Sequence, residues 1–177
     1  MGVVYEGETG IDRKKFPSGL KSYVNKIKDI GLKPAIWIGG FCPKNSKIYK
    51  EKKDWFIDYN YRVEWTAPLD VSLPEVRKYM LLALDKFFVE YGFEGVKHDF
   101  WSYAFEDSHD LLTYKEKSGY EYRSWWLSEI RKRLPSFGYM ESGCDIGLGN
   151  PFLGEFFDNY RYGRLSFNID ENIRIIS

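Results

Sequence analysis

The sequence predicts an α/β fold in which parallel strands alternate with helices. Short apolar runs alternate along the chain with longer segments whose apolar residues recur every three or four positions. Strands separated by helices pair in parallel, because each helix returns the chain to the same end of the sheet. The chain has 177 residues, of which 44% are hydrophobic, so it can bury a core of ordinary size. We therefore expect residues 1–177 to form one domain.

The first helix is expected over residues 18–30, with Ser18 as its N-cap and Gly31 as its end. Five apolar residues recur there at helical spacing: Leu20, Tyr23, Val24, Ile27 and Ile30. Residues 32–40, LKPAIWIGG, follow as a buried strand closed by two glycines. Residues 42–72 then form a long polar connection, and connections of that length in a compact domain are usually functional loops.

The second helix has the strongest signals in the chain. Ser72 and Glu75 match an S-x-x-E capping box, Pro74 lies in the first turn, and Gly92 ends the helix. Its apolar stripe consists of Val76, Tyr79, Met80, Ala83, Leu84, Phe87, Phe88 and Tyr91. The segment that follows, GFEGVKHDFWS, is predicted to be a strand (residues 92–102).

The last third of the chain predicts one further helix and two further strands. A loop over 101–118 leads to a helix near 119–134, and strands follow at 137–144 and 155–163. The inner side of that helix is predicted to carry Tyr122, Trp125, Trp126, Ile130 and Leu134. A glycine-rich loop, DIGLGNPFLG, separates the two strands.

Composition and charge exclude several classes of function. Lys plus Arg number 26 and Asp plus Glu number 26, which argues against a nucleic-acid or anionic-membrane partner. The two cysteines lie about a hundred residues apart and form no zinc or disulfide pattern. No apolar run approaches the ~20 residues that span a bilayer. The first ten residues resemble no signal peptide, so a cytoplasmic location is expected.

Lys97 and Asp99 are the candidate functional pair. Side chains alternate along a strand, so Val96, His98 and Phe100 share one face and Lys97 and Asp99 share the other. We expect the apolar face to lie under helices. A lysine near a carboxylate favours the ionised form, which a nucleophile requires. The alternative is a buried ion pair that serves only structure, although such pairs are seldom better for stability than apolar residues.

Other residues with reactive side chains are weaker candidates. His98 and His109 lie near Asp99, but their spacing matches no strong ligand motif, and no metal is expected. Glu141 near a strand end is either a carboxylate that supports the site or a residue with a surface or ion-paired role. The high aromatic content, 19%, suits carbohydrate faces, but for most rings packing in the core is the simpler interpretation.

Several motifs in order resemble a known family. They are KFPSGLKSYVNKIKDIGLKPAIWI, then DWFI, then LDVSLPEVRKYMLLALDKFFVEYGFEGVKHDFW. Together they are similar to the catalytic barrel of the α-galactosidases of glycoside hydrolase family 36 (melibiases) and their clan relatives. The match runs from about residue 15 to 102, and ESGCDIGLGNPFLGEFFDNYRYG resembles the next two strands. It implies a TIM (β/α)8-barrel type of fold and a retaining glycosidase that acts on α-galactosides without a cofactor.

The resemblance also implies roles for single residues. Asp99 would be the nucleophile at the end of the K-x-D strand. Trp37 and Lys97 would hold the hydroxyls and ring of the sugar, Cys144 would lie near it, and Arg161 would belong to the segment that carries the acid/base.

The acid/base residue is harder to place. In the family it usually follows the glycine of D-x-x-R-x-G by two residues, and this position is Leu165 here. Asp158 is the nearest carboxylate by motif and the provisional choice, with Asp170 and Glu171 as later candidates. The chain also has Gly39 and Gly40 where the family often continues into Pro-Glu, and MGVVYEGETG lacks the family's paired aspartates.

Chain length leaves two other functions open. An eight-stranded barrel typically needs ~250 residues, so the four predicted strands correspond to about half of a barrel. The alternatives to an enzyme are an inactive, truncated barrel that keeps only sugar binding, or a βα interaction module that uses its open sheet edges. A small carbohydrate is the expected partner, and a homo-oligomer is a further expectation.

Overall fold

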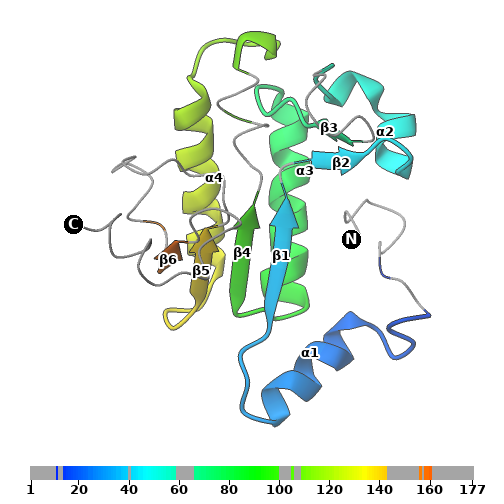
Figure 1. The fold of residues 1–177 in the computed structure, drawn as a ribbon, viewed down its shortest axis with the longest axis vertical. Helices are drawn as coiled ribbons and strands as arrows, with labels where there is room; N and C mark the ends of the chain where they lie inside the picture. Colours follow the sequence, from blue (N-terminus) through cyan, green and yellow to red (C-terminus); the bar gives the residue numbers. More distant parts are fainter. Residues whose placement is uncertain are drawn as a thin grey trace, which may run out of the picture.

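The computed structural model describes residues 11, 14–39, 41–58, 66–99, 105, 109–142, 156 and 158–160. Its main sheet contains β1 (Ala35–Gly39), β4 (Gly95–Asp99), β5 (Tyr139–Ser142) and β6 (Asn159–Tyr160). These strands are parallel and lie side by side in the order β1-β4-β5-β6 (Figure 1). The predicted α/β fold with parallel strands is therefore confirmed.

Two helices lie along one face of this sheet. They are α3 (Pro74–Leu84), which continues as a π-helix η2 (Asp85–Glu90), and α4 (Gly119–Arg133). In Figure 1 they run behind β1, β4 and β5. The core lies between helices and strands, and its members under 2% exposed include Leu84, Val96, Leu127, Ile130 and Met140. Within the described residues, none of the helices combines the length and apolar character that crossing a membrane requires.

Helix α1 (Leu20–Asp29) lies beyond the amino ends of the strands (Figure 1). An ion pair of 2.7 Å between Lys28 and Glu94 fastens it to the segment before β4. The predicted end at Gly31 is confirmed, because this glycine has a φ of 80°, a conformation that L-residues avoid. The predicted cap is wrong. Gly19 is the N-cap, and no side chain caps the helix.

The long connection after β1 contains structure that the sequence did not reveal. It forms β2 (Phe41–Pro43), α2 (Lys47–Glu51), η1 (Lys53–Trp55) and β3 (Thr66–Pro68). Strands β2 and β3 pair antiparallel as a separate small sheet. In Figure 1 this unit lies above the carboxyl end of β1. It therefore lies at the end of the sheet where Asp99 is located, beyond the carboxyl ends of the strands.

The predicted capping box at the start of α3 is wrong. Leu73 is the N-cap and makes no side-chain capping bond. Ser72 instead donates its hydroxyl to Asp70 at 2.5 Å and accepts the Tyr114 N–H at 3.0 Å. The second oxygen of Asp70 accepts the Thr113 N–H at 3.0 Å. These bonds fasten the segment before α4 to the start of α3.

A capping box is present at the start of α4. The Ser118 hydroxyl accepts the Glu121 N–H, and the Glu121 carboxylate accepts the Ser118 N–H at 2.7 Å. Bonds from the Ser118 backbone and hydroxyl lower the pKa of Glu121. The helix predicted near 119–134 is confirmed, and four of its five predicted inner residues are buried: Tyr122, Trp126, Ile130 and Leu134. Trp125 is only partly buried.

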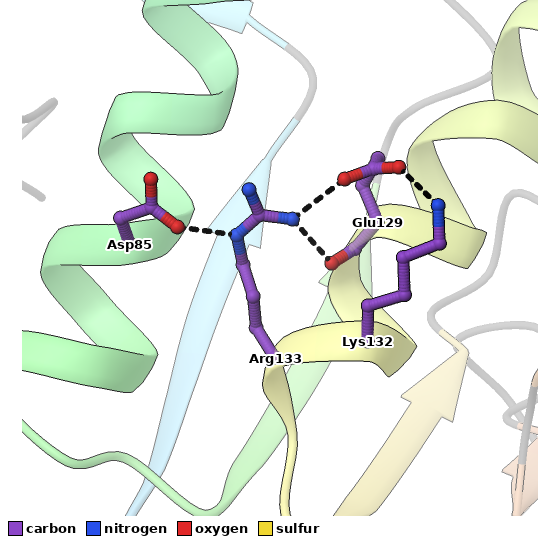
Figure 2. A network of polar contacts seen from close by, with 4 residues as sticks. All are labelled: Asp85, Glu129, Lys132 and Arg133. Atoms are coloured by element: carbon purple, nitrogen blue, oxygen red, sulfur yellow. Dashed lines mark hydrogen bonds and ion pairs between the residues drawn. The ribbon is translucent and has the colours of Figure 1, made fainter.

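Arg133 joins the end of α4 to the start of η2 (Figure 2). Its guanidinium donates to Asp85 at 2.6 Å and to the Glu129 carboxylate at 2.7 Å. Lys132 approaches the other oxygen of Glu129 at 2.6 Å. Burial opposes the charge of Arg133, but the hydrogen bonds to Glu129 and Asp85 outweigh it and raise the pKa. The bond from Lys132 lowers the pKa of Glu129.

Candidate active site

The candidate site lies on the face of the sheet opposite α3 and α4. The register aligns Trp37 with Lys97 and Lys97 with Glu141 across three strands, and it aligns Gly39 with Asp99 one row further toward the carboxyl ends. Alternate residues point the other way, under the helices, and Val96 and His98 are 1% and 0% exposed there. The predicted division of faces is confirmed for these residues. Phe100 lies outside the described residues.

Asp99 is the last residue of β4 and has 7% of its surface exposed. The Trp37 indole, on the neighbouring strand β1, donates its Nε1–H to Asp99 Oδ2 at 3.1 Å. A buried carboxylate needs hydrogen-bond donors to replace water. The sheet therefore presents an oriented acidic group at the carboxyl end of a parallel strand, the end where α/β barrels place their chemistry.

Gly39 makes room for this contact. A Cβ added at Gly39 would lie 2.7 Å from Trp37 Cη2 and 2.9 Å from Cζ3. The indole therefore lies over residue 39, along its own strand, and extends from the row of Lys97 to the row of Asp99. The Phe41 ring packs edge-on against it at 6.5 Å between centroids.

Lys97 directs its ammonium toward the next strand. Its Nζ lies 3.9 Å from Glu141 Oε1, and both side chains are 26% exposed. The sequence places Lys97 on the same face as Asp99, and this is confirmed. The sequence does not show, however, that Lys97 pairs with Glu141, because pairing across strands depends on the register. At this separation and exposure the ion pair contributes at most about 1 kcal/mol.

Asp158 lies at the opposite end of the sheet from Asp99. Its Oδ2 accepts the Met140 N–H at 2.7 Å and a bond from Arg131 at 2.9 Å. The bonds from Met140 and Arg131 outweigh the effect of burial and lower the pKa of this carboxylate. It also lines a hollow of about 490 Å³ at the amino ends of the strands, beside Lys33.

The register gives the separation of the two carboxylates. Glu141 pairs with Lys97 on one side and with Asn159 on the other. Asp158 lies one residue before Asn159, and Asp99 lies two residues after Lys97, so the two positions are three residues apart along the strand direction. Three steps of about 3.3 Å and two strand spacings of about 4.8 Å place the two backbones roughly 14 Å apart. The acid and nucleophile of a retaining glycosidase lie about 5–5.5 Å apart. The structure does not bring Asp158 to Asp99, and this arrangement does not support its predicted role as acid/base.

The remaining predicted residues lie outside the described part of the chain. They are Cys144 and Arg161, together with the later acid/base candidates Asp170 and Glu171. The other cysteine, Cys42 on β2, is 2% exposed, and burial raises its pKa to about 12. Its thiol is therefore protonated at neutral pH and unsuited to nucleophilic attack.

His98 belongs to the core and not to the candidate site. Burial lowers its pKa well below the usual value of 6.5, and the buried Arg123 guanidinium lowers it further. A neutral imidazole under the helices cannot assist Asp99 on the other face. Within the described ranges, no group of three or more His, Cys, Asp or Glu side chains is arranged to hold a metal ion.

A family model described as melibiase matches residues 5–128, which is more than half of the chain. The chain belongs to the melibiase family. The match includes β1, which holds Trp37, and β4, which holds Lys97 and Asp99. Among curated proteins, no relative matches the sequence at a significant level.

Solved α-galactosidases share the fold of this melibiase-family chain. The glycoside hydrolase family 36 α-galactosidase AgaA of Geobacillus stearothermophilus aligns over 96% of the chain at 19% identity, with a TM-score of 0.69. The α-galactosidase of Lactobacillus brevis aligns over 75% at 20% identity and a TM-score of 0.55. The enzyme of Thermus thermophilus, solved with stachyose, aligns over 73% at 20% identity and a TM-score of 0.53.

These alignments confirm the predicted TIM-barrel type of fold, of which the chain contains a part. They cover 25%, 19% and 28% of the three solved chains, so this chain spans about a quarter of their length. The parallel order β1-β4-β5-β6 is one continuous portion of such a barrel wall. The face that carries Trp37, Lys97 and Asp99 is the concave side of that wall in a closed barrel, because the helices α3 and α4 cover the other side.

Proposed function

We propose that this melibiase-family chain carries the nucleophile of a retaining glycosidase that acts on α-galactosides, and that the nucleophile is Asp99. The observation that carries the proposal is the position of Asp99. It is a buried carboxylate at the carboxyl end of a parallel strand, it accepts the Trp37 indole N–H, and it lies on the face opposite the helices. A carboxylate at this place can approach a sugar bound against the inner wall of a barrel.

The reaction would proceed in two displacements at the anomeric carbon. An Asp99 carboxylate oxygen attacks that carbon, the bond to the leaving oxygen breaks, and the leaving oxygen takes a proton from a carboxylic acid. The product is a galactosyl ester of Asp99. Water then attacks the same carbon, its proton passes to the carboxylate that had supplied the first one, and the released Asp99 is again an anion.

The proton donor is proposed to be a carboxylate other than Asp158, because Asp158 is bound to Arg131 and to the Met140 amide far from Asp99. Asp170 and Glu171 are the candidates. An acid variant is recognised by its substrate dependence, since a leaving group of low pKa needs little protonation. We expect Asp170→Asn or Glu171→Gln to lose activity on raffinose and keep a fast first step on a nitrophenyl galactoside, and Asp158→Asn to show no such difference.

The substrate class follows from the site and from the neighbours. Solved α-galactosidases with this fold are described in complex with stachyose and with raffinose. Lys97 and Trp37 provide an ammonium and an indole beside Asp99, and such groups bind sugar hydroxyls and pack against a pyranose ring. We propose that both contact the galactosyl unit. Cys144 and Arg161 are proposed, on the family resemblance, as further contacts with the sugar and its surroundings.

Release of nitrophenol from a nitrophenyl α-galactoside tests the proposal. Wild-type chain should turn over, Asp99→Asn should lose at least a thousandfold in kcat, and Asp29→Asn should match the wild type, because Asp29 is exposed on α1. Full activity in Asp99→Asn would contradict the assignment. A wild type without turnover whose melting temperature still rises with galactose would instead indicate a sugar-binding chain. A wild type that is indifferent to sugar and oligomeric in solution would indicate an interaction module.

A further inference from the structure

We propose that Trp37 is a positioning residue that holds the Asp99 carboxylate, and that Gly39 is the residue that allows it to do so. The indole N–H to Asp99 Oδ2 contact of 3.1 Å carries the inference, together with the space over Gly39. The inference rests on the proposed role of Asp99 as nucleophile. It adds a function for Trp37 beyond contact with the sugar.

The strand geometry explains why a tryptophan is suited to this position. Gly39 faces Asp99 in the register, and Trp37 lies two residues earlier on the same face of the sheet. Two residues of a strand span about 6.6 Å, so a donor on residue 37 must reach along its own strand to meet Asp99. The indole is a large, flat side chain that carries its N–H donor on the five-membered ring, three bonds from Cβ, while its six-membered ring extends over Gly39. It bridges this gap without displacing the backbone.

A side chain at position 39 would block that path. The added Cβ would lie 2.7 Å and 2.9 Å from the far edge of the indole, closer than carbon atoms approach in folded proteins. The Phe41 ring packs edge-on against the same indole. The orientation of Trp37 is thus set by Gly39, which has no side chain beneath the ring, and by the Phe41 ring next to it.

The contact limits the directions that the Asp99 carboxylate can take. A carboxylate is planar, so a bond that fixes Oδ2 also fixes the direction of Oδ1. Correct direction of the attacking oxygen is a large part of catalysis by a nucleophile. Because a hydrogen bond to a charged group is a strong one, we expect its loss to lower the rate of the chemical step roughly ten- to hundredfold.

The contact itself is tested by NMR of the indole N–H groups, which needs no enzymatic activity. The chain has six tryptophans, and the Trp37 signal is the one that disappears in Trp37→Phe. We expect this signal to shift in Asp99→Asn and in Gly39→Ala, and to stay unchanged in Trp125→Phe, a matched loss of an indole on α4. A Trp37 signal that responds to neither Asp99→Asn nor Gly39→Ala would overturn the inference. If Gly39→Ala does not fold, the Asp99→Asn spectrum alone decides.

The separate effects of a substitution on kcat and on KM distinguish a positioning role from contact with the sugar. We expect Trp37→Phe to lower kcat on the nitrophenyl α-galactoside by about ten- to hundredfold and to change KM less than threefold. Gly39→Ala should lower kcat in the same direction with Trp37 intact. A raised KM with an unchanged kcat in Trp37→Phe would overturn the positioning role. A wild type without turnover refutes the proposed function and not the contact, which the indole spectra continue to decide.

Discussion

The ammonium of Lys97 lies 3.9 Å from the carboxylate of Glu141, one strand away and in register with it. The pair lies on the same face as Asp99 and one row nearer the amino ends of the strands. Two neighbouring contacts therefore arrange this face, the Lys97–Glu141 pair and the Trp37–Asp99 bond. We expect Glu141 to direct Lys97 in the way that Trp37 is proposed to direct Asp99.

Glu141→Gln should weaken the binding of sugar and barely change stability. The side chain keeps its shape, but Lys97 loses the charge that directs it, so we expect galactose affinity, measured by calorimetry, to fall about two- to fivefold. The free energy of unfolding should change by less than about 1 kcal/mol, because both side chains are partly exposed. The account of Glu141 would be contradicted if Lys97→Met weakened binding and Glu141→Gln left it unchanged.

Arg133→Met should destabilise the fold. The variant removes the guanidinium that binds the Glu129 carboxylate, which is only 15% exposed. It also breaks the link from α4 to Asp85 at the start of η2 (Figure 2). We expect the free energy of unfolding, measured in urea, to fall by about 1–3 kcal/mol. Lys132→Met is the matched control and should cost less than about 0.5 kcal/mol, because its side chain is 64% exposed. Equal effects of the two variants would contradict this difference.

Stability should decrease as the pH falls below about 6.5. In the folded chain, burial and Arg123 keep the pKa of His98 well below its usual 6.5, so the unfolded state binds this proton first. A fall in pH stabilises the state that binds more protons, which here is the unfolded state, so the free energy of unfolding decreases. Urea titrations between pH 8 and 5 should show the loss, and His98→Leu should remove most of it. A pH-independent wild type over this window would contradict the buried neutral histidine.

A second loss of stability is expected at lower pH. The pKa values of Glu121, Glu129 and Asp158 are lowered by their hydrogen bonds in the folded chain. These carboxylates contribute fully to the free energy of unfolding above their ordinary pKa, which is 4.5 for the glutamates and 3.8 for the aspartate. This contribution is lost as the pH falls through the lowered values. The loss due to His98 therefore precedes that of the carboxylates, and His98→Leu should leave the second loss in place.

Asp158→Asn should affect stability and not catalysis. The variant weakens the bond to Arg131 and the acceptor of the Met140 amide, and we expect a cost of about 1 kcal/mol in the free energy of unfolding. Because Asp158 lies roughly 14 Å from Asp99, kcat on a nitrophenyl α-galactoside should stay within twofold of the wild type. A fall of a hundredfold or more in kcat would restore Asp158 as the acid/base.

Periodicity and glycine positions predicted much of the fold. The alternation of helices with parallel strands, the two faces of β4 and the ends of helices at Gly31 and Gly92 depend on local pattern, and the structure has each of them. The sequence also shows Gly39 as a departure from the family pattern, but only the structure shows the Trp37 indole over it.

Features that depend on distant partners could not be predicted. The chain contains an S-x-x-E motif at both Ser72 and Ser118, and only the second forms a capping box. Ser72 is bound instead by Asp70 and by the Tyr114 amide, and a tertiary contact of this kind leaves no local signal. The strands β2 and β3 could not be predicted for a different reason, because three residues are too few to show alternation.

Trapping of the covalent intermediate tests the central claim most directly. A 2-deoxy-2-fluoro-α-galactosyl substrate with a good leaving group slows the second displacement and lets the galactosyl ester accumulate. The account predicts that mass spectrometry of the digested chain finds one fluorogalactosyl unit on the peptide that carries Asp99, and that Asp99→Asn carries none. Hydrolysis of the α-galactoside with the label on another residue, or with an unmodified Asp99 peptide, would contradict it.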